Sequence, residues 1–344
     1  MKPPMDWDTL SVQFTQTDYM FIAETDAHNT WKKGEICSFK NLQISPASAV
    51  FNYGQAAFEG LKALHSVKGN VVLCRPIENA RRFHRAAARL EMPPYPLDEF
   101  IQAVKDTVRA NAPWIPPHEK GSLYIRPVMI GNGPVLGVGP APSYIFFIFV
   151  CPVRQYMPGE GKLVVLDSVH RTAHFSTGDI KASGNYAGTL RPHRIAASKG
   201  YKDVLYLDSR LDKFVEELGS SNFFAVLRDG TLVTPQLGAI LPGVTRDSVI
   251  TIANELFGWN VAERELHIEE VLVHAQEAFF TGTAAVIQPV TTIGYKGRDY
   301  KIGTGEVGES TKELSRTLKE IQTQQRADPF SWVEEIGADL AVSV

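Results

Sequence analysis

The sequence predicts a two-domain protein of the α/β (α+β) class, and three observations support this. The chain has 344 residues, more than one domain usually holds. With 44% hydrophobic and 21% charged residues, it can bury sizeable cores. Helical and strand-like segments follow one another, and the stretch Arg-Gln-Tyr-Met-Pro-Gly-Glu-Gly has the composition of an interdomain linker. We expect a smaller N-terminal domain over 1–153, the linker over 154–161 and a larger C-terminal domain over 162–344.

Composition excludes several classes of function. The formal net charge is -3 and charges of both signs are mixed, so no basic run is present to follow a nucleic acid backbone. The first residues lack an apolar core of signal-peptide length, and the longest apolar run, 144–150, is too short to span a membrane. Cys37, Cys74 and Cys151 are odd in number and far apart, which favours a reducing compartment. We therefore expect a cytoplasmic protein with no nucleic acid or membrane partner.

The first part of the chain contains strand signals at 12–24 and 71–74 and two amphipathic helices at 78–90 and 98–114. Between these signals, 47–64 is rich in apolar and small residues.

Three side chains in this part have two possible roles. Tyr53 and Phe58 are either core aromatics or walls of an apolar pocket. Arg82 lies next to Phe83, near the buried face of the first helix. It is either a snorkelling arginine or a phosphate ligand, for which a guanidinium has suitable charge and geometry.

A strand is predicted at 122–130. Tyr124 and Arg126 are two residues apart and so point to the same face, where a phenol and a guanidinium could hold a carboxylate. The alternative is an edge strand with one polar face, which Pro127 favours. The loop 131–142 matches neither a Walker A motif nor a dinucleotide fingerprint, and a buried strand follows at 143–153.

The second part of the chain continues this alternation, with strands at 162–167 and 203–208, a helix at 185–199, a hairpin through 228–230, a helix from 241 to 257, a strand-turn-strand unit at 277–290 and a helix at 308–326. Alternation along 214–219 places one of two neighbouring glutamates, Glu216 and Glu217, on an interior face, where a carboxylate needs a partner. Thr245 lies in the first turn of a helix, whose free amides can bind an anion. Thr283 places a hydroxyl in the turn at 281–285. His170 and His174 lack a third ligand, so no metal site is expected.

Lys181 lies in the stretch 176–188, Ser-Thr-Gly-Asp-Ile-Lys-Ala-Ser-Gly-Asn-Tyr-Ala-Gly. Small neighbours let a planar ligand approach the backbone, and partial desolvation lowers the pKa of an amine, so this lysine is a candidate for Schiff-base formation. No other lysine in the sequence has comparable surroundings. The alternative is an ordinary lysine on a glycine-rich turn.

Together these signals correspond to a pyridoxal phosphate site: a lysine for the aldehyde, a carboxylate for the pyridine nitrogen, a phenol for the ring oxygen and a cup for the phosphate. In its order of motifs the chain resembles the class IV, fold-type IV aminotransferases, most closely the branched-chain amino acid aminotransferases. The resemblance runs from residue 14 to residue 332. Its most specific stretches are 53–62, 75–82, 124–127, 181–186, 217–224, 241–247 and 281–285.

The resemblance implies a role for each candidate residue and places the cofactor at the domain interface. Lys181 would carry pyridoxal 5'-phosphate and move the substrate proton, Glu217 would pair with the pyridine nitrogen, and Tyr186 with the ring oxygen. The phosphate would be held by Arg82, the amides of Val244 and Thr245 and the hydroxyl of Thr283. The substrate would be held by Tyr53, Phe58, Tyr124, Arg126 and the amides of Thr283 and Ala284.

The implied reaction is ping-pong transamination of L-leucine, L-isoleucine and L-valine with 2-oxoglutarate, in a homodimer or higher homo-oligomer. The chain departs from the family pattern in three ways: the segment 174–178 is poorer in glycine, Ser183 replaces a common glycine, and Ala285 and Gln288 replace a cysteine pair. Two alternatives stay open. One is a D-amino acid or R-selective amine aminotransferase, or an aminodeoxychorismate lyase, of the same fold. The other is a vitamin-binding or regulatory protein without turnover.

Overall fold

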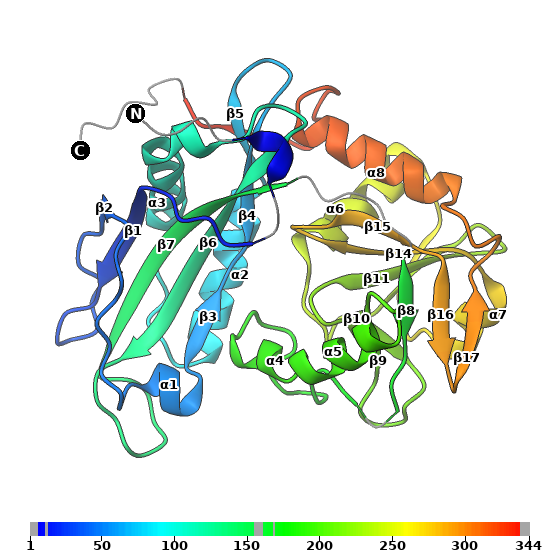
Figure 1. Cartoon of the computed structure of the whole chain (residues 1–344), viewed down its shortest axis with the longest axis horizontal. Coiled ribbons are helices and arrows are strands. Elements are labelled where there is room, and N and C mark those ends of the chain that lie inside the picture. Colours follow the sequence, from blue (N-terminus) through cyan, green and yellow to red (C-terminus); the bar gives the residue numbers. More distant parts are fainter. Residues whose placement is uncertain (1–5, 11–12, 155–160, 168, 338–344) are drawn as a thin grey trace. The chain divides into compact units, whose positions relative to one another are not determined.

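The computed structural model describes residues 6–10, 13–154, 161–167 and 169–337. Contacts group them into two compact units (Figure 1). Unit 1 holds the residues up to 154, Lys181–Gly184, and those from Glu320 onward; unit 2 holds 161–180 and Asn185–Lys319. The predicted linker, 154–161, lies outside the described residues except at its two ends. The predicted domain boundaries stay a prediction.

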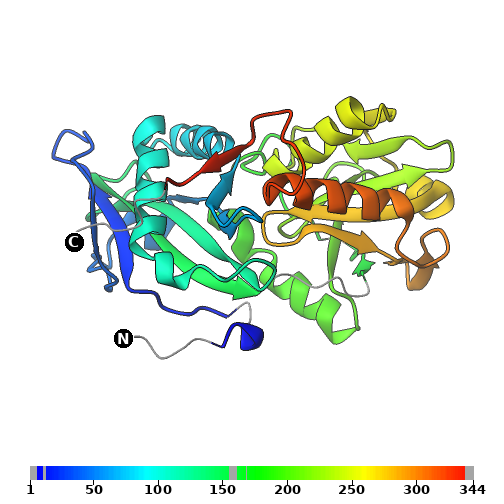
Figure 2. The same ribbon diagram turned by 90° about the horizontal axis from the view of Figure 1, so that it is seen from above.

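Unit 1 is built on an antiparallel sheet with the strand order β18-β5-β4-β6-β7-β1-β2, to which β3 adds beside β6. Its strands are β1 (Tyr19–Glu24), β2 (Glu35–Ser38), β3 (Ala56–Phe58), β4 (Leu61–His65), β5 (Val71–Cys74), β6 (Gly121–Asn132), β7 (Ser143–Arg154) and β18 (Val333–Glu335). The last strand comes from the C-terminal part of the chain and pairs with β5 (Figure 2).

Two helices, α2 (Pro76–Arg89) and α3 (Leu97–Ala110), supply most of the helical cover of this sheet. In α2 the apolar residues recur at helical spacing, so that Phe83 and Ala87 are buried while Arg81 and Arg85 are exposed. The predicted helix at 98–114 ends earlier than expected, because a separate 3-10 turn, η2 (Ala112–Trp114), follows α3. The remaining helical pieces of unit 1 are short: η1 (Trp7–Thr9) and α1 (Ala49–Tyr53).

The alternative of an edge strand at 122–130 is wrong, because β6 pairs with β7 on one side and with β3 and β4 on the other. Pro127 is tolerated in this interior strand because it faces the break between β3 and β4. Its carbonyl accepts a hydrogen bond from the Glu59 amide at 2.9 Å, and no regular ladder requires an amide from it there. If the strand opposite β6 were unbroken, residue 127 would have to donate an amide hydrogen bond, and proline has no amide hydrogen to donate. The break between β3 and β4 lies at this position.

Unit 2 contains a mixed sheet with the order β13-β12-β11-β10-β9-β8-β16-β17, and β14 and β15 extend from β11. Its strands are β8 (Lys162–Val164), β9 (Asp203–Leu207), β10 (Val215–Leu218), β11 (Asn222–Leu227), β12 (Leu232–Pro235), β13 (Val261–Arg264), β14 (Ala275–Gly282), β15 (Val286–Val290), β16 (Thr292–Tyr295) and β17 (Arg298–Lys301). The pairs β8·β9, β8·β16 and β12·β13 are parallel. The predicted hairpin through 228–230 is confirmed, since β11 and β12 pair antiparallel.

The predicted helix at 185–199 is two helices, α4 (Gly184–Ala187) and α5 (Leu190–Ser198). The helix predicted from 241 starts as α6 (Val244–Thr251) and ends in a π-helical turn, η3 (Ile252–Leu256). The other helices are α7 (Ile268–His274) and α8 (Glu309–Gln322). Side chains of β9, β10, β11 and α7 fill one apolar core, which includes Leu205, Leu218, Phe223 and Ile268. Among the described residues, no helix combines the length and apolar character needed to cross a bilayer.

Candidate active site

The backbone of Lys181 is held against the sheet of unit 1. Its carbonyl accepts a hydrogen bond from the Phe58 amide at 3.1 Å, the Ser183 amide donates to the Ala56 carbonyl at 2.9 Å, and Ala57 and Ala182 form an antiparallel bridge. The segment 181–183 therefore acts as a short extra strand beside β3. A loop would leave the amine free to move, whereas this pairing fixes the point from which the lysine side chain extends.

The Lys181 side chain enters a cluster of charged and aromatic groups. Its Nζ lies 4.8 Å from the centre of the Phe58 ring, and Arg126 Cζ lies at the same distance from that ring. Loss of water around the amine, followed by the nearby charge of Arg82, lowers the pKa of Lys181 to about 8. The predicted desolvated lysine is therefore present, and it loses its proton far more readily than an exposed lysine does.

Tyr124 and Arg126 share one face of β6, as the spacing predicts. Arg126 Nη2 donates to the Tyr124 hydroxyl at 3.1 Å, and the guanidinium also lies 5.1 Å from the Tyr124 ring centre. Arg126 Nε is buried and makes no hydrogen bond to any group in the described part of the chain. A buried donor without an acceptor is costly, so this pair fits a carboxylate ligand.

Arg82 is buried, but its nearest partner was not predicted. Its Nε and Nη2 atoms contact the two carboxylate oxygens of Glu59, at 2.7 and 2.8 Å. Burial opposes ionisation of Glu59, yet the charge and hydrogen bond of Arg82, together with Lys181 and Asn79, outweigh it, so the pKa of this carboxyl is lowered. The motif 53–62 contains Glu59, but a single glutamate beside a glycine carries no signal of its charge partner 23 residues away.

The expectation that no lysine other than Lys181 has comparable surroundings is wrong, because Lys62 is desolvated as well. It faces Tyr124 across the β4·β6 ladder, and burial lowers its pKa to about 8. Tyr53, by contrast, lies on exposed α1, where its hydroxyl donates to the Leu136 carbonyl. Its predicted role in the pocket stays a prediction.

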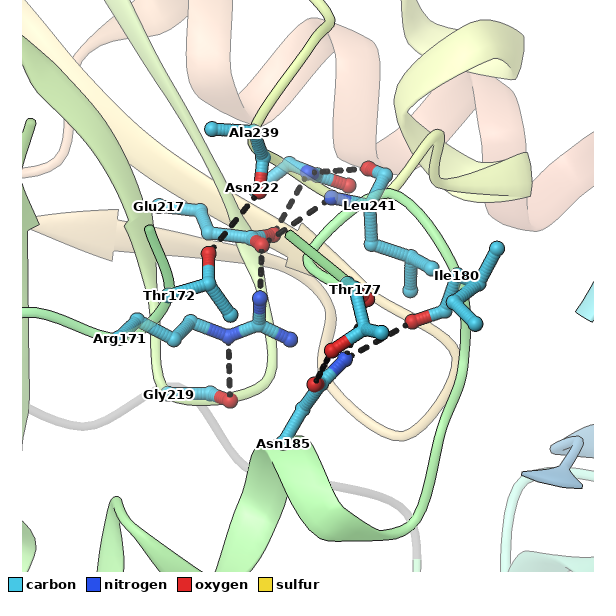
Figure 3. A network of polar contacts seen from close by, with 10 residues as sticks. All are labelled: Arg171, Thr172, Thr177, Ile180, Asn185, Glu217, Gly219, Asn222, Ala239 and Leu241. Carbon is cyan, nitrogen blue, oxygen red and sulfur yellow. Dashed lines mark hydrogen bonds and ion pairs between the residues drawn. The ribbon is translucent and has the colours of Figure 1, made fainter. Parts of the chain in front are cut away.

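Unit 2 carries the second group of predicted residues, centred on Glu217 of β10 (Figure 3). Arg171 Nη1 lies 2.6 Å from Glu217 Oε1, the Leu241 amide donates to the same oxygen at 3.1 Å, and Asn222 Nδ2 donates to Oε2 at 3.1 Å. The interior carboxylate thus has the cationic and hydrogen-bonding partners that its burial requires. Glu216 is also buried, so the expectation that only one of the two faces the interior is wrong.

Asn222 connects Glu217 to the start of α6. Its Nδ2 also donates to the Leu241 carbonyl at 2.9 Å, and a Cβ on Gly243 would meet its Oδ1 at 2.1 Å. Glycine at position 243 lets the loop pass close to Asn222 before α6 begins at Val244. Val244 and Thr245 are therefore in the first turn of α6, as predicted.

Strand register aligns the turn at 283–285 with Glu217. Glu217 pairs with Asn222, Asn222 pairs with Thr281, and β14 ends one residue later at Gly282. Thr283 and Ala284 follow in the turn to β15.

Tyr186 of α4 belongs to the same unit, with Arg171 Cζ 5.5 Å from its ring centre. Arg171 and Asn222 were not among the predicted residues, although Asn222 falls inside the motif 217–224.

Among the described residues, the His, Cys, Asp and Glu side chains form no group of three that could hold a metal ion. The donor set instead suits an anionic organic molecule in both units. In unit 1, Arg82 and Arg126 act on the Lys181 amine and, among its main charged neighbours in the described residues, only Glu59 is a carboxylate, so positive charge predominates around the amine. In unit 2, a helix start and a small-residue turn lie near a buried carboxylate.

Comparison with known proteins agrees with this chemistry. The family model described as amino-transferase class IV matches residues 56–293. The chain is 44% identical over 337 residues to the branched-chain amino acid aminotransferase 2, chloroplastic, of Humulus lupulus, covering 96% of this chain and 82% of that protein. It is 40% identical to the branched-chain-amino-acid aminotransferase of Helicobacter pylori, covering 97% and 98%.

Among solved structures, the chain is similar to the branched-chain amino acid aminotransferase from Thermobaculum terrenum in its PLP-form, the holo-form. The TM-score is 0.77 at 25% identity, and the match covers 94% of this chain and 99% of the other.

Proposed function

Since the chain belongs to the amino-transferase class IV family, we propose that it transfers the amino group of L-leucine, L-isoleucine or L-valine to 2-oxoglutarate. The products are the branched 2-oxo acid and L-glutamate. The observation that carries this proposal is the near full-length identity of about 40% to relatives named for this activity. The cofactor is pyridoxal 5'-phosphate, which accords with the PLP-form of the similar enzyme from Thermobaculum terrenum.

Bound pyridoxal phosphate supplies an aldehyde that bonds an amine and a ring that accepts electrons. Lys181 is the residue that holds it in our proposal. With a pKa of about 8, the amine can give up a proton and take one back near neutral pH, so it can move the proton at the substrate's α-carbon. Phe58 supports the lysine from β3, at 4.8 Å from the amine.

Further residues would hold the cofactor. Arg82, the amides of Val244 and Thr245 and the hydroxyl of Thr283 would bind its phosphate, since a guanidinium and a helix start both favour an anion. Tyr186 would donate to the ring oxygen. Glu217 would contact the pyridine nitrogen, and its buried ion pair with Arg171 favours a carboxylate charged at this position.

The two carboxylates of glutamate need two sites. Arg126 would take the distal carboxylate, because its buried Nε lacks an acceptor in the described residues. Tyr124 and the amides of Thr283 and Ala284 would take the α-carboxylate. Phe58 and Tyr53 would line the space for aliphatic side chains, which excludes water from the reacting atoms.

A spectroscopic titration tests this activity. Purified protein loaded with pyridoxal phosphate should lose its visible absorbance when L-leucine is added and regain it with 2-oxoglutarate. D-alanine should leave the absorbance unchanged. A loss of absorbance with D-alanine but not L-leucine would contradict the proposal and favour a D-amino acid aminotransferase of the same fold.

We also propose that the protein is a homo-oligomer, at least a dimer. An apolar surface formed by α1 and the loop 133–142 supports this, with Phe51, Leu136 and Val138 exposed by 62%, 92% and 89%. The Val135 amide donates to the carbonyl of Ala47, two residues before α1, at 2.9 Å, which holds the loop beside the start of that helix. Light scattering should give a dimer mass or more, and Leu136→Asp should lower it. A monomeric wild type would contradict the proposal.

A cytoplasmic location is our third proposal. All three cysteines are free, as a reducing compartment requires, although the similar protein of Humulus lupulus is named chloroplastic. Fractionation of the source cells should recover the protein with cytoplasmic markers, and recovery in an organelle fraction would contradict this.

A further inference from the structure

Glu59 is a buried carboxylate to which the proposed reaction assigns no role. It lies at the break between β3 and β4, with no exposed surface, opposite Pro127 of β6. Its backbone amide is held by the Pro127 carbonyl at 2.9 Å, so the side chain starts from a rigid position. A buried charge is retained in a fold only when it is well paired, and a merely structural site would be better filled by an apolar residue.

The contacts of Glu59 hold one edge of the Arg82 guanidinium. Its Oε1 accepts from Arg82 Nε at 2.7 Å and its Oε2 accepts from Arg82 Nη2 at 2.8 Å. Asn79, one turn earlier in α2, donates to Oε2 at 2.8 Å, and the Gly60 amide donates to the same atom at 3.1 Å. This two-point contact sets both the position and the plane of the guanidinium, which a single contact would not do.

Glu59 also acts on Lys181. Four groups of unit 1 bear on this amine: Arg82 from α2, Tyr124 and Arg126 from β6, and Glu59 from the β3–β4 break. The two arginines lower the pKa of Lys181, whereas Glu59 and Tyr124 raise it. Without the Glu59 charge, two cations would face the amine with a phenol alone to oppose them.

We propose that Glu59 is a positioning residue, which orients Arg82 toward the cofactor's phosphate and offsets the positive charge around the Lys181 amine. This inference rests on the proposed function, because it assigns Glu59 a task in holding pyridoxal phosphate. In this proposal Glu59 contacts neither substrate nor cofactor. It acts through Arg82 and Lys181, which do.

The test compares Glu59→Gln with wild type and with Glu78→Gln, a partly exposed glutamate on the same helix as Arg82 that pairs with Arg81 at 2.6 Å. Affinities for pyridoxal phosphate and for pyridoxal, which lacks the phosphate, are measured by absorbance titration. Glu59→Gln should weaken pyridoxal phosphate binding by about tenfold or more and leave pyridoxal binding almost unchanged, because the loss acts through a charge-assisted phosphate contact. Glu78→Gln should change neither.

A second readout is the pH midpoint of the bound cofactor's visible absorbance. Removal of the Glu59 charge makes protonation of the Lys181 nitrogen less favourable, so the midpoint should fall by roughly one pH unit in Glu59→Gln. Glu59→Asp keeps the charge and should keep the wild-type midpoint, while the shorter side chain loses part of the phosphate preference. A purely structural role would lower the melting temperature without moving either the affinity ratio or the midpoint.

Two outcomes overturn the inference. One is a folded Glu59→Gln protein with the wild-type affinity ratio and midpoint. The other applies if that variant does not fold: Glu59→Asp with an unchanged affinity ratio. Wild-type protein that binds no pyridoxal phosphate would instead contradict the proposed function, so the two failures are distinguishable.

Discussion

Arg171 and Glu217 form an ion pair of 2.6 Å in the interior of unit 2, with their side chains exposed by 1% and 3%. The pair ties the loop before Lys181 to β10. Arg171 Nε also donates to the Gly219 carbonyl at 3.3 Å, so the arginine contacts both the strand and the turn that follows it. The carboxylate proposed for the pyridine nitrogen is therefore fixed in place by the protein itself.

Replacing Arg171 with methionine should destabilise the cofactor-free protein. The change leaves Glu217 buried without its cation, which costs on the order of 3 kcal/mol of unfolding free energy. Adding Glu217→Gln should recover most of the loss, because a neutral amide needs no counter-charge. Urea denaturation of the two single variants and the double variant measures this. A single Arg171→Met variant as stable as wild type would show that the pair contributes little.

Replacing Lys181 with methionine should abolish both the visible absorbance and turnover, yet stabilise the cofactor-free protein. Burial and Arg82 lower the pKa of Lys181 from 10.5 to about 8, so the folded state carries a charged amine at a cost below pH 8. Between pH 8 and 10.5 this lysine is more protonated in the unfolded chain than in the folded protein. The free-energy cost of the charged Lys181 in the folded state therefore disappears as the pH rises through that window. We expect a gain of roughly 1 to 2 kcal/mol at about pH 7 that shrinks by about pH 10.

The control for this prediction is Lys62→Met, since Lys62 is the other lysine with a pKa lowered to about 8. It should keep the visible absorbance with pyridoxal phosphate. If Lys62→Met loses the absorbance and Lys181→Met keeps it, the assignment of the two lysines is reversed.

Replacing Arg126 with alanine should harm the glutamate half-reaction more than the leucine half-reaction. The distal carboxylate of glutamate would lose its cation, a loss of about 3 kcal/mol or roughly a hundredfold in rate, whereas leucine has no charge there. Single-turnover kinetics with each amino acid separates the two effects, with Arg109→Ala, a partly exposed arginine of α3 that pairs with Asp106, as a control. Equal losses for both substrates would exclude Arg126 as the distal clamp.

Glu216 predicts a pH dependence of stability. Burial, followed by the neighbouring charge of Glu217, raises the pKa of Glu216 from 4.5 to about 7. Between pH 4.5 and pH 7, Glu216 is more protonated in the folded state than in the unfolded state. The folded protein therefore loses stability as the pH rises from about 4.5 to 7. Glu216→Gln should remove this loss, with a gain of about 1 kcal/mol at about pH 8 and none at about pH 4.5. Denaturation at the two pH values checks this, and a gain of equal size at both would point to packing instead of charge.

Local patterns predict most of the helices and strands and the positions of several candidate residues on them. The spacing of Tyr124 and Arg126 places them on one face because strand geometry alternates side chains, and the β11–β12 and β14–β15 hairpins follow from their turn residues. A prediction from local sequence fails where contacts with distant segments change the local preference. Pro127 indicates an edge strand, but the break at Glu59 accommodates proline inside the sheet.

By itself, the sequence determined the α/β class and the family motifs and made Lys181 the candidate for the reactive amine, because each depends on residues close together in the chain. Only the tertiary structure decided the charge partners. Glu59 meets Arg82, Arg171 meets Glu217, and Lys62 loses its water as Lys181 does. A pKa depends on the charges and the solvent around a group, and these come from segments that meet only when the chain has folded.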